Sequence, residues 1–130
     1  MLITINDDDI RPVYVQIIDQ VKEQIQKGYL KPGDELPSFR ELSQNLGINM
    51  HTVRHAYDEL RNQGILVFRL GQRARVAKWE KKKPDKAEIE DKIGAKLEYL
   101  LTEAFLMGLS GKDFRNIVEE KIEKNKGIKR

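Results

Sequence analysis

The chain has 130 residues with 24 lysines and arginines against 21 aspartates and glutamates, and its formal net charge of +3 is too small to indicate a partner. It contains no cysteine and only two histidines, His51 and His55, which excludes disulfide frameworks and thiolate metal sites and predicts neither a metal nor a cofactor. The first ten residues lack the pattern of a secretory signal, and no apolar run reaches the roughly 20 residues that span a bilayer, so we expect a cytoplasmic protein without membrane contact.

The positive charge gathers in the middle of the chain. Residues 11–77 carry ten basic and seven acidic side chains, and residues 78–86 carry five and two, whereas residues 87–130 carry nine of each. Arg69, Arg73 and Arg75 belong to this basic stretch. A local positive surface attracts polyanions, although a solvated face of a protein with no such partner has the same composition.

The first predicted helix starts near Pro12, a residue that suits the first turn because its missing N–H is not needed there. A short extended segment containing Ile3 precedes it. Apolar residues then recur at steps of three and four, which is typical of one face of an amphipathic helix. They are Tyr14, Ile17, Ile18, Val21 and Ile25, and Gly28 ends the pattern.

Two short helices follow, joined by a turn that contains a glycine. Ser38 and Glu41 have the spacing of a capping box at the start of the first, and Gly47 supplies a left-handed cap at its end. Asn49 is a good N-cap for the second, which ends at Gly64. The second helix has an apolar face of Val53, Ala56, Tyr57 and Leu60. This arrangement is the helix-turn-helix pattern.

A β-hairpin is predicted next. The apolar run of residues 65–68 is typical of a strand, residues 75–77 return beside it, and Gly71 with Gln72 forms the tip. We expect residues 1–77 to form a winged helix-turn-helix domain. The polar segment 78–86 is expected to be a linker, and residues 87–130 a helical region.

The helical region is predicted to contain two amphipathic helices. Gly108 separates them, and Ser110 with Asp113 forms a second capping box. Packing within one chain explains their apolar stripes, but two helices alone bury little surface, and a second copy would complete a core in a twofold homodimer. The expected dimer contacts are Ile93, Leu97, Leu100, Leu101, Ala104, Phe105, Phe114, Ile117 and Val118. The fold class is thus mainly α with a small β-hairpin wing, followed by a two-helix dimerisation hairpin.

The spaced residues of segment 12–77 resemble the GntR family of bacterial and archaeal transcription regulators. The block from Gly33 to Leu42 and the block from Leu46 to Gly64 both match the family pattern, as do Gly71 and Val76 in the wing. The rest of the chain is similar to the YtrA subfamily, which has a two-helix C-terminal unit instead of a large effector domain. The resemblance implies control of transporter genes.

Two positions depart from the family pattern. Asn49-Met50 stands where the family usually has Ser-Arg, so an arginine that would reach DNA is missing. The wing reads Gly71-Gln72-Arg73 where Gly-x-Gly is usual. The general mode of binding survives both changes, but the operator sequence cannot be transferred from the family.

The resemblance, together with helix-turn-helix docking geometry, implies which residues contact double-stranded DNA. They are Ser38, Arg40, Asn49, Met50, His51, Thr52, Arg54, Gly71, Gln72 and Arg73. Arg54 either donates to guanine O6 and N7 or to a phosphate, or it pairs with Asp58 on its own helix. Ser38 is first of all a cap, and Thr52 combines a phosphate contact with local capping.

Three more parts of the predicted site have an alternative role. Met50 either packs on a thymine methyl or is simply exposed. His51 either contacts DNA or is a neutral surface residue. With His55 at i, i+4 it has the spacing of two metal ligands, but Asp58 is the one nearby carboxylate on that face, so we expect no metal site. The wing tip either approaches the minor groove or is an ordinary exposed turn.

The sequence therefore predicts a DNA-binding transcription regulator that represses as a homodimer on an inverted repeat. A winged-helix module that binds RNA or a protein partner, and a scaffold whose charges are solvated, are the alternatives. No enzyme is expected, because the chain has no glycine-rich phosphate loop, metal-ligand cluster or Ser/His/Asp set. The sequence identifies no effector, operator or target gene, and it does not itself decide between repression and activation, of which we expect repression.

Overall fold

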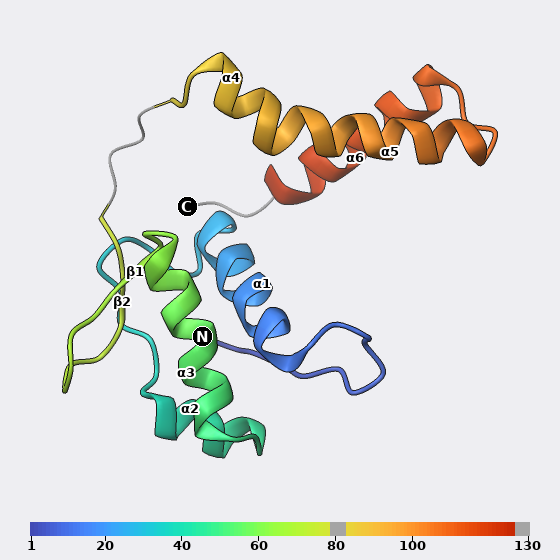
Figure 1. Ribbon diagram of the computed structural model, residues 1–130. Coiled ribbons are helices and arrows are strands. Elements are labelled where there is room, and N and C mark those ends of the chain that lie inside the picture. Colours follow the sequence, from blue (N-terminus) through green and yellow to red (C-terminus); the bar gives the residue numbers. More distant parts are fainter. Residues whose placement is uncertain (79–82, 127–130) are drawn as a thin grey trace. The chain divides into compact units, whose positions relative to one another are not determined.

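The computed structural model describes residues 1–78 and 83–126 (Figure 1). Residues 79–82, within the expected linker 78–86, and residues 127–130 of the basic tail lie outside the described residues. The chain divides at this linker into two compact units. We call them the N-terminal unit (residues 1–78) and the C-terminal unit (residues 83–126).

The N-terminal unit consists of three helices and a two-stranded sheet. Its elements in chain order are α1 (Val13–Gln26), α2 (Phe39–Leu46), α3 (Met50–Asn62), β1 (Leu66–Val67) and β2 (Arg75–Val76). Helices α1 and α2 both pack against α3, and β1 also contacts α3 (Figure 1). The strands are antiparallel, with Leu66 opposite Val76. Mainly helical structure with a small β-hairpin is what the sequence predicted, and this prediction is confirmed.

The predicted helix boundaries of the helix-turn-helix are confirmed by its caps. Ser38 Oγ accepts a hydrogen bond from the Glu41 N–H over 3.1 Å, and Asn49 Oδ1 accepts one from the His51 N–H over 2.7 Å. Gly47 ends α2 in the left-handed conformation, with φ of 67°. This φ strains any residue with a Cβ, so glycine is required there for the chain to turn from α2 into α3.

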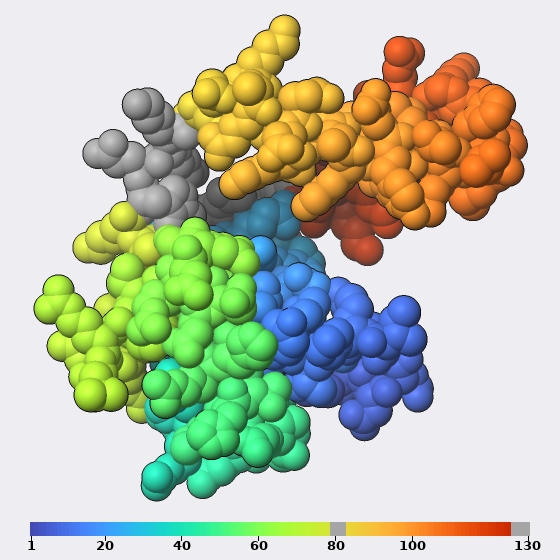
Figure 2. All heavy atoms as spheres, in the orientation of Figure 1, coloured from blue at the N-terminus to red at the C-terminus, as the bar shows by residue number. Residues whose placement is uncertain are grey.

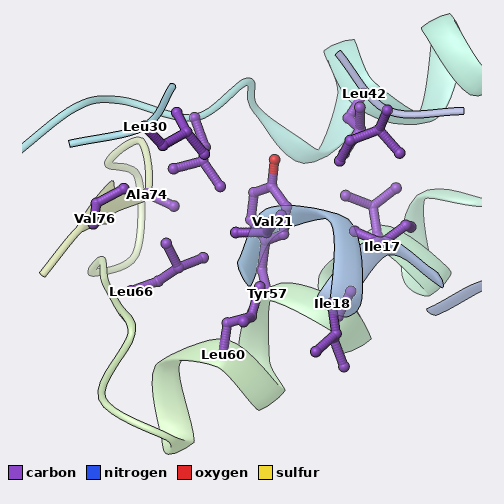
Figure 3. Close-up of a cluster of buried hydrophobic side chains, with 14 residues drawn as sticks. Ile17, Ile18, Val21, Leu30, Leu42, Tyr57, Leu60, Leu66, Ala74 and Val76 are labelled. Atoms are coloured by element: carbon purple, nitrogen blue, oxygen red, sulfur yellow. The ribbon is translucent and has the colours of Figure 1, made fainter. Parts of the chain in front are cut away.

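One apolar core holds these elements together (Figure 3). Ile17 and Val21 of α1 meet Val53, Tyr57 and Leu60 of α3, and all five side chains are fully buried. Leu42, Leu66 and Val76 add α2 and the hairpin to the same cluster. Since the apolar faces predicted for α1 and α3 face each other, the opposite side of α3 is left for solvent or a ligand.

A ladder of three glutamines fixes the N-terminal segment on α1. Gln16, Gln20 and Gln24 stand four residues apart, on one side of the helix. The amide of Gln20 accepts from the Thr4 N–H at 3.0 Å and donates to the Thr4 carbonyl at 2.6 Å, so it mimics a neighbouring strand. Gln16 pairs with Asn6 in the same way. Sequence reasoning did not predict this ladder.

The C-terminal unit contains helical segments on both sides of one turn. They are α4 (Lys86–Ile89), η1 (Glu90–Gly94), α5 (Ala95–Leu106) and α6 (Gly111–Lys126), and the first three follow without a break. The segment η1 is π-helical and was not predicted. The turn at Gly108 (φ 86°) and the capping box are confirmed, because Ser110 N donates to Asp113 Oδ2 at 2.9 Å while Asp113 N donates to Ser110 Oγ at 3.1 Å.

The C-terminal unit has almost no core of its own. Among its described residues only Ala104 is buried. Large apolar side chains of α5 and α6 stay exposed over 37–77% of their surface. They include Leu97, Leu100, Leu101, Phe105, Ile117, Val118 and Ile122. Within residues 1–78 and 83–126, no helix is long and apolar enough to cross a membrane.

Candidate nucleic-acid interface

The exposed face of α3 carries the central residues of the predicted site. Because Val53, Ala56 and Tyr57 are fully buried, the side of α3 away from them is uncovered. Figure 2 shows atoms of α3 (green) at the surface of the N-terminal unit. His51 and Arg54 are exposed on it, so the structure leaves both accessible to a ligand.

Arg54 extends from this face beside a carboxylate of its own helix. Its side chain is 60% exposed, and its Nε lies 3.9 Å from Asp58 Oδ2. Asp58 also accepts a hydrogen bond from Arg61 Nη2 at 3.1 Å. The i, i+4 pair that the sequence offered as an alternative is therefore present, and the large exposure of Arg54 leaves its guanidinium open to solvent.

The first turn of α3 combines capping with exposed side chains. The Asn49 carboxamide is engaged as the cap, and the Thr52 N–H donates to the Asn49 carbonyl at 3.0 Å. Met50 is 42% exposed, whereas Thr52 is half-buried. Asn49 thus has a structural role in the free chain, while Met50 presents an apolar surface where the family usually has a cation.

An aromatic contact joins α3 to the start of α1. The rings of Tyr14 and His55 are stacked, with 4.0 Å between centroids and 16° between planes. This contact could not be predicted from the sequence, because the two residues are 41 positions apart. Within the described residues no group of three or more side chains could hold a metal ion, so His51 and His55 do not belong to such a group there.

The start of α2 presents a cap and an exposed cation. Ser38 Oγ is engaged with the Glu41 N–H, as described above, and Arg40 follows in the first turn with its side chain exposed. Arg40 forms no ion pair with any described carboxylate. Backbone N–H groups at the start of a helix together with a free guanidinium favour an anion.

Two arginines of the wing, Arg73 and Arg75, are bound by carboxylates of the same unit. Arg73 Nη2 pairs with Glu41 of α2, and its Nε lies 3.9 Å from Glu35. Arg75 pairs with the other oxygen of Glu35 at 2.5 Å. The hydrogen bond from Arg73 holds the pKa of Glu41 below its usual value. The sequence prediction for Arg73 did not foresee that a carboxylate already holds it.

A cleft of about 400 Å³ brings half of the predicted site together. It lies between the start of α2, the exposed side of α3 and the wing. Its lining includes Ser38, Arg54, Gly71, Gln72 and Arg73 from the predicted set. Arg40, Asn49, Met50, His51 and Thr52 lie outside this cleft, on the first turns of α2 and α3. Leu70, fully exposed at the wing tip, also lines the cleft and was missed.

Comparisons with known proteins show which family the chain is similar to. Residues 13–76 match the model of the family described as bacterial regulatory proteins, gntR family. The uncharacterized HTH-type transcriptional regulator YhcF of Bacillus subtilis (strain 168) is 34% identical over 92% of this chain and 88% of its own length. The HTH-type transcriptional repressor YtrA of the same organism is 48% identical, over half of each protein. These relatives are transcription regulators, not enzymes.

Three solved structures are similar to the chain. A transcriptional antiterminator from Listeria monocytogenes EGD-e has a TM-score of 0.83 at 26% identity, covering 96% of this chain and 92% of its own. YtrA from Sulfolobus acidocaldarius, a GntR-family transcription factor, has a TM-score of 0.57 at 33% identity, covering 94% and 97%. AraR(DBD) in complex with operator ORX1 has a TM-score of 0.53 at 28% identity, covering 59% and 96%.

Proposed function

Because this chain belongs to the GntR family of transcription regulators, we propose that it represses transcription as a homodimer that occupies an inverted-repeat operator and so blocks the polymerase. The single observation that carries the proposal is the cleft that joins the start of α2, Arg54 on α3 and the wing. Similarity to a domain solved on its operator supports DNA as the ligand. Bacterial operators lie in the cytoplasm, which is the location we propose.

Helix α3 is proposed to enter the major groove with its N-terminal end first. Arg54 then faces the base edges, with Met50 and His51 on the first turn beside it. Arg40 and the start of α2 contact the phosphate backbone. A bidentate arginine–guanine contact is worth about 1–3 kcal/mol of discrimination, and contacts to phosphate add affinity without sequence preference.

The wing is proposed to approach the adjacent groove through Gly71 and Gln72. Gly71 has a φ of 80° and no neighbouring atom within 4 Å of an added Cβ, so the tip stands clear of the rest of the unit. Arg73 is bound to Glu41 in the free protein and must exchange this carboxylate for a phosphate or a base edge. Because Arg73 loses its ion pair with Glu41 in this exchange, it contributes less to the free energy of DNA binding. Arg54 and Arg40 are then the main cationic contacts.

The C-terminal unit is proposed to form the dimer. Leu97, Leu101 and Phe105 are 42%, 42% and 76% exposed in the single chain, and burial of such surface yields about 25 cal/mol per Å². A two-helix unit with one buried residue does not have a core that supports it alone. A second copy would supply the missing core, and a twofold dimer presents two recognition helices about 34 Å apart.

The experiment that tests the function is selection of duplexes from random DNA by the purified chain, followed by mobility-shift titration of the selected duplex. We expect an inverted repeat with half-sites about one helical turn apart and log affinity that falls linearly with log salt. Recovery of no consensus would contradict sequence-specific binding, and a flat salt response would contradict phosphate contacts.

RNA binding is the second candidate, because a similar structure is that of a transcriptional antiterminator. The same titration with a duplex RNA of matching sequence separates the two ligands. A-form RNA has a deep and narrow major groove that α3 cannot enter, so we expect weaker binding than to DNA. Tighter binding to RNA would replace the DNA proposal with this one.

A further inference from the structure

Asp58 lies on the exposed face of α3 and faces two arginines of its own helix. Its Oδ1 accepts a hydrogen bond from Arg61 Nη2 at 3.1 Å, and its Oδ2 lies 3.9 Å from Arg54 Nε. An acidic side chain on a surface that binds a polyanion is unfavourable by itself, because phosphates repel it. The two arginines beside Asp58 offset the repulsion between its carboxylate and the phosphates. The same carboxylate connects Arg54 to Arg61.

Arg61 is in turn anchored at the base of the wing. Its guanidinium carbon lies 4.4 Å from the ring centroid of Phe68, the residue that follows β1. Phe68 packs edge-on against Phe39 of α2, with 5.9 Å between centroids, and Phe39 packs in the same way on buried Tyr57. A guanidinium over an aromatic face is attracted by the ring quadrupole. One oxygen of Asp58 is therefore fixed by a side chain that rests on a packed aromatic cluster.

We propose that Asp58 and Arg61 are positioning residues that orient Arg54 for reading a guanine, an inference that rests on the proposed function. Asp58 lies on the Nε side of Arg54. The terminal nitrogens Nη1 and Nη2, which pair with no described carboxylate, form the fork that donates to guanine O6 and N7. An arginine that is oriented before binding loses less side-chain entropy on contact.

This role separates base discrimination from overall affinity. Replacing Asp58 by asparagine removes a negative charge near the phosphates, which by itself strengthens binding to every duplex. The same change frees Arg54 to turn, which weakens only the contact with its base. An ion pair that merely stabilised α3 would leave discrimination between bases unchanged.

The experiment measures fluorescence anisotropy of the full chain on its selected duplex, on duplexes with each G·C pair replaced in turn, and on an unrelated duplex, all at one salt concentration. Asp58→Asn is compared with Glu59→Gln, which removes the same charge from the adjacent position and belongs to neither ion pair. Arg54→Ala identifies the base pair that Arg54 reads. Circular dichroism confirms that each variant is folded.

A bidentate arginine–guanine contact accounts for roughly 5- to 150-fold discrimination. We expect Asp58→Asn to reduce discrimination at the Arg54 position about two- to fivefold, the range that an exposed ion pair supplies, with equal or tighter binding to the unrelated duplex. Glu59→Gln should keep the discrimination of the wild type. Arg61→Gln should reduce discrimination in the same direction as Asp58→Asn, and it provides the test if Asp58→Asn is unfolded.

Two failures are distinguishable. If Arg54→Ala changes discrimination at no base pair, the proposed contact of Arg54 with DNA is wrong. If Arg54→Ala removes discrimination at one base pair but a folded Asp58→Asn or Arg61→Gln keeps it, the positioning role is overturned and the DNA contact stands. In the Arg54→Ala background, Asp58→Asn should cause no further loss at that base pair.

Discussion

The hydroxyl of Tyr57 donates a hydrogen bond to the carbonyl oxygen of Pro37 over 2.8 Å. Tyr57 is fully buried on α3, and Pro37 immediately precedes Ser38, the cap of α2. The bond therefore connects the core side of α3 to the start of α2. Both Arg40 and Arg54 depend on the relative placement of these two helices.

Removing this hydroxyl should destabilise the N-terminal unit. Tyr57→Phe leaves the ring in the core but deprives the Pro37 carbonyl of its donor, which costs about 1–2 kcal/mol of unfolding free energy. Urea denaturation followed by circular dichroism measures it. Tyr29→Phe is the matched control, because Tyr29 is 64% exposed, and it should change stability little. Equal unfolding free energies of the two variants would show that the Tyr57–Pro37 hydrogen bond does not stabilise the N-terminal unit.

The ion pair between Glu41 and Arg73 predicts a pH dependence with a definite sign. Its hydrogen bond lowers the pKa of Glu41 in the folded chain, so the pair contributes stability above the unfolded pKa of about 4.3. That contribution is lost as the pH falls through the lower, folded pKa. Glu41→Gln should therefore be less stable than the wild type at pH 7 and approach it in acid, as measured by urea midpoints. A difference that is the same at both pH values would contradict the pair.

A side chain at position 47 should destabilise the chain although there is room for it. No atom lies within 4 Å of a Cβ added there, yet the φ of Gly47 is 67°. Gly47→Ala should lower the unfolding free energy by about 1–2 kcal/mol, because the left-handed conformation strains an L-residue. Gly111→Ala, at the first residue of α6 and equally open, should show no such loss in thermal denaturation. Equal effects of the two substitutions would contradict backbone strain as the cause.

The proposed dimer predicts that a charge on the apolar stripe of α5 separates the subunits. Leu101→Lys should convert a dimer to a monomer in light scattering, because a lysine cannot be buried there without a partner. Leu106→Lys is the control, since Leu106 lies about 140° around the helix from Leu101 and outside the predicted set. A Leu101→Lys variant that remains dimeric would place the interface elsewhere.

The sequence predicted those features that depend on neighbours along the chain. The caps at Ser38 and Asn49 and the buried face from Val53 to Leu60 follow from spacings of three and four residues, and the structure confirms them. The left-handed cap at Gly47 was also predictable, because it depends on the end of α2 directly before it. The exposed face of α3 then follows, because a helix with one buried side must leave the other uncovered.

The sequence could not predict contacts between residues far apart along the chain. The pairing of Arg73 with Glu41 spans 32 positions, and the stack of Tyr14 on His55 depends on how α1 lies on α3. Neither contact follows a period in the sequence. Asp58 was recognised as a partner of Arg54, but its link through Arg61 to Phe68 required the fold of the wing. The π-helical segment before α5 likewise has no sequence signal that we identify.

The most direct test of the account is the affinity of Arg54→Ala for the duplex that the wild type selects, measured at one salt concentration. Arg115→Ala, an exposed arginine of α6, is the control for loss of one positive charge. Arg54→Ala should bind roughly 5- to 150-fold more weakly, while Arg115→Ala binds as the wild type does. Wild-type affinity and base preference in Arg54→Ala would contradict the claim that the exposed face of α3 reads DNA.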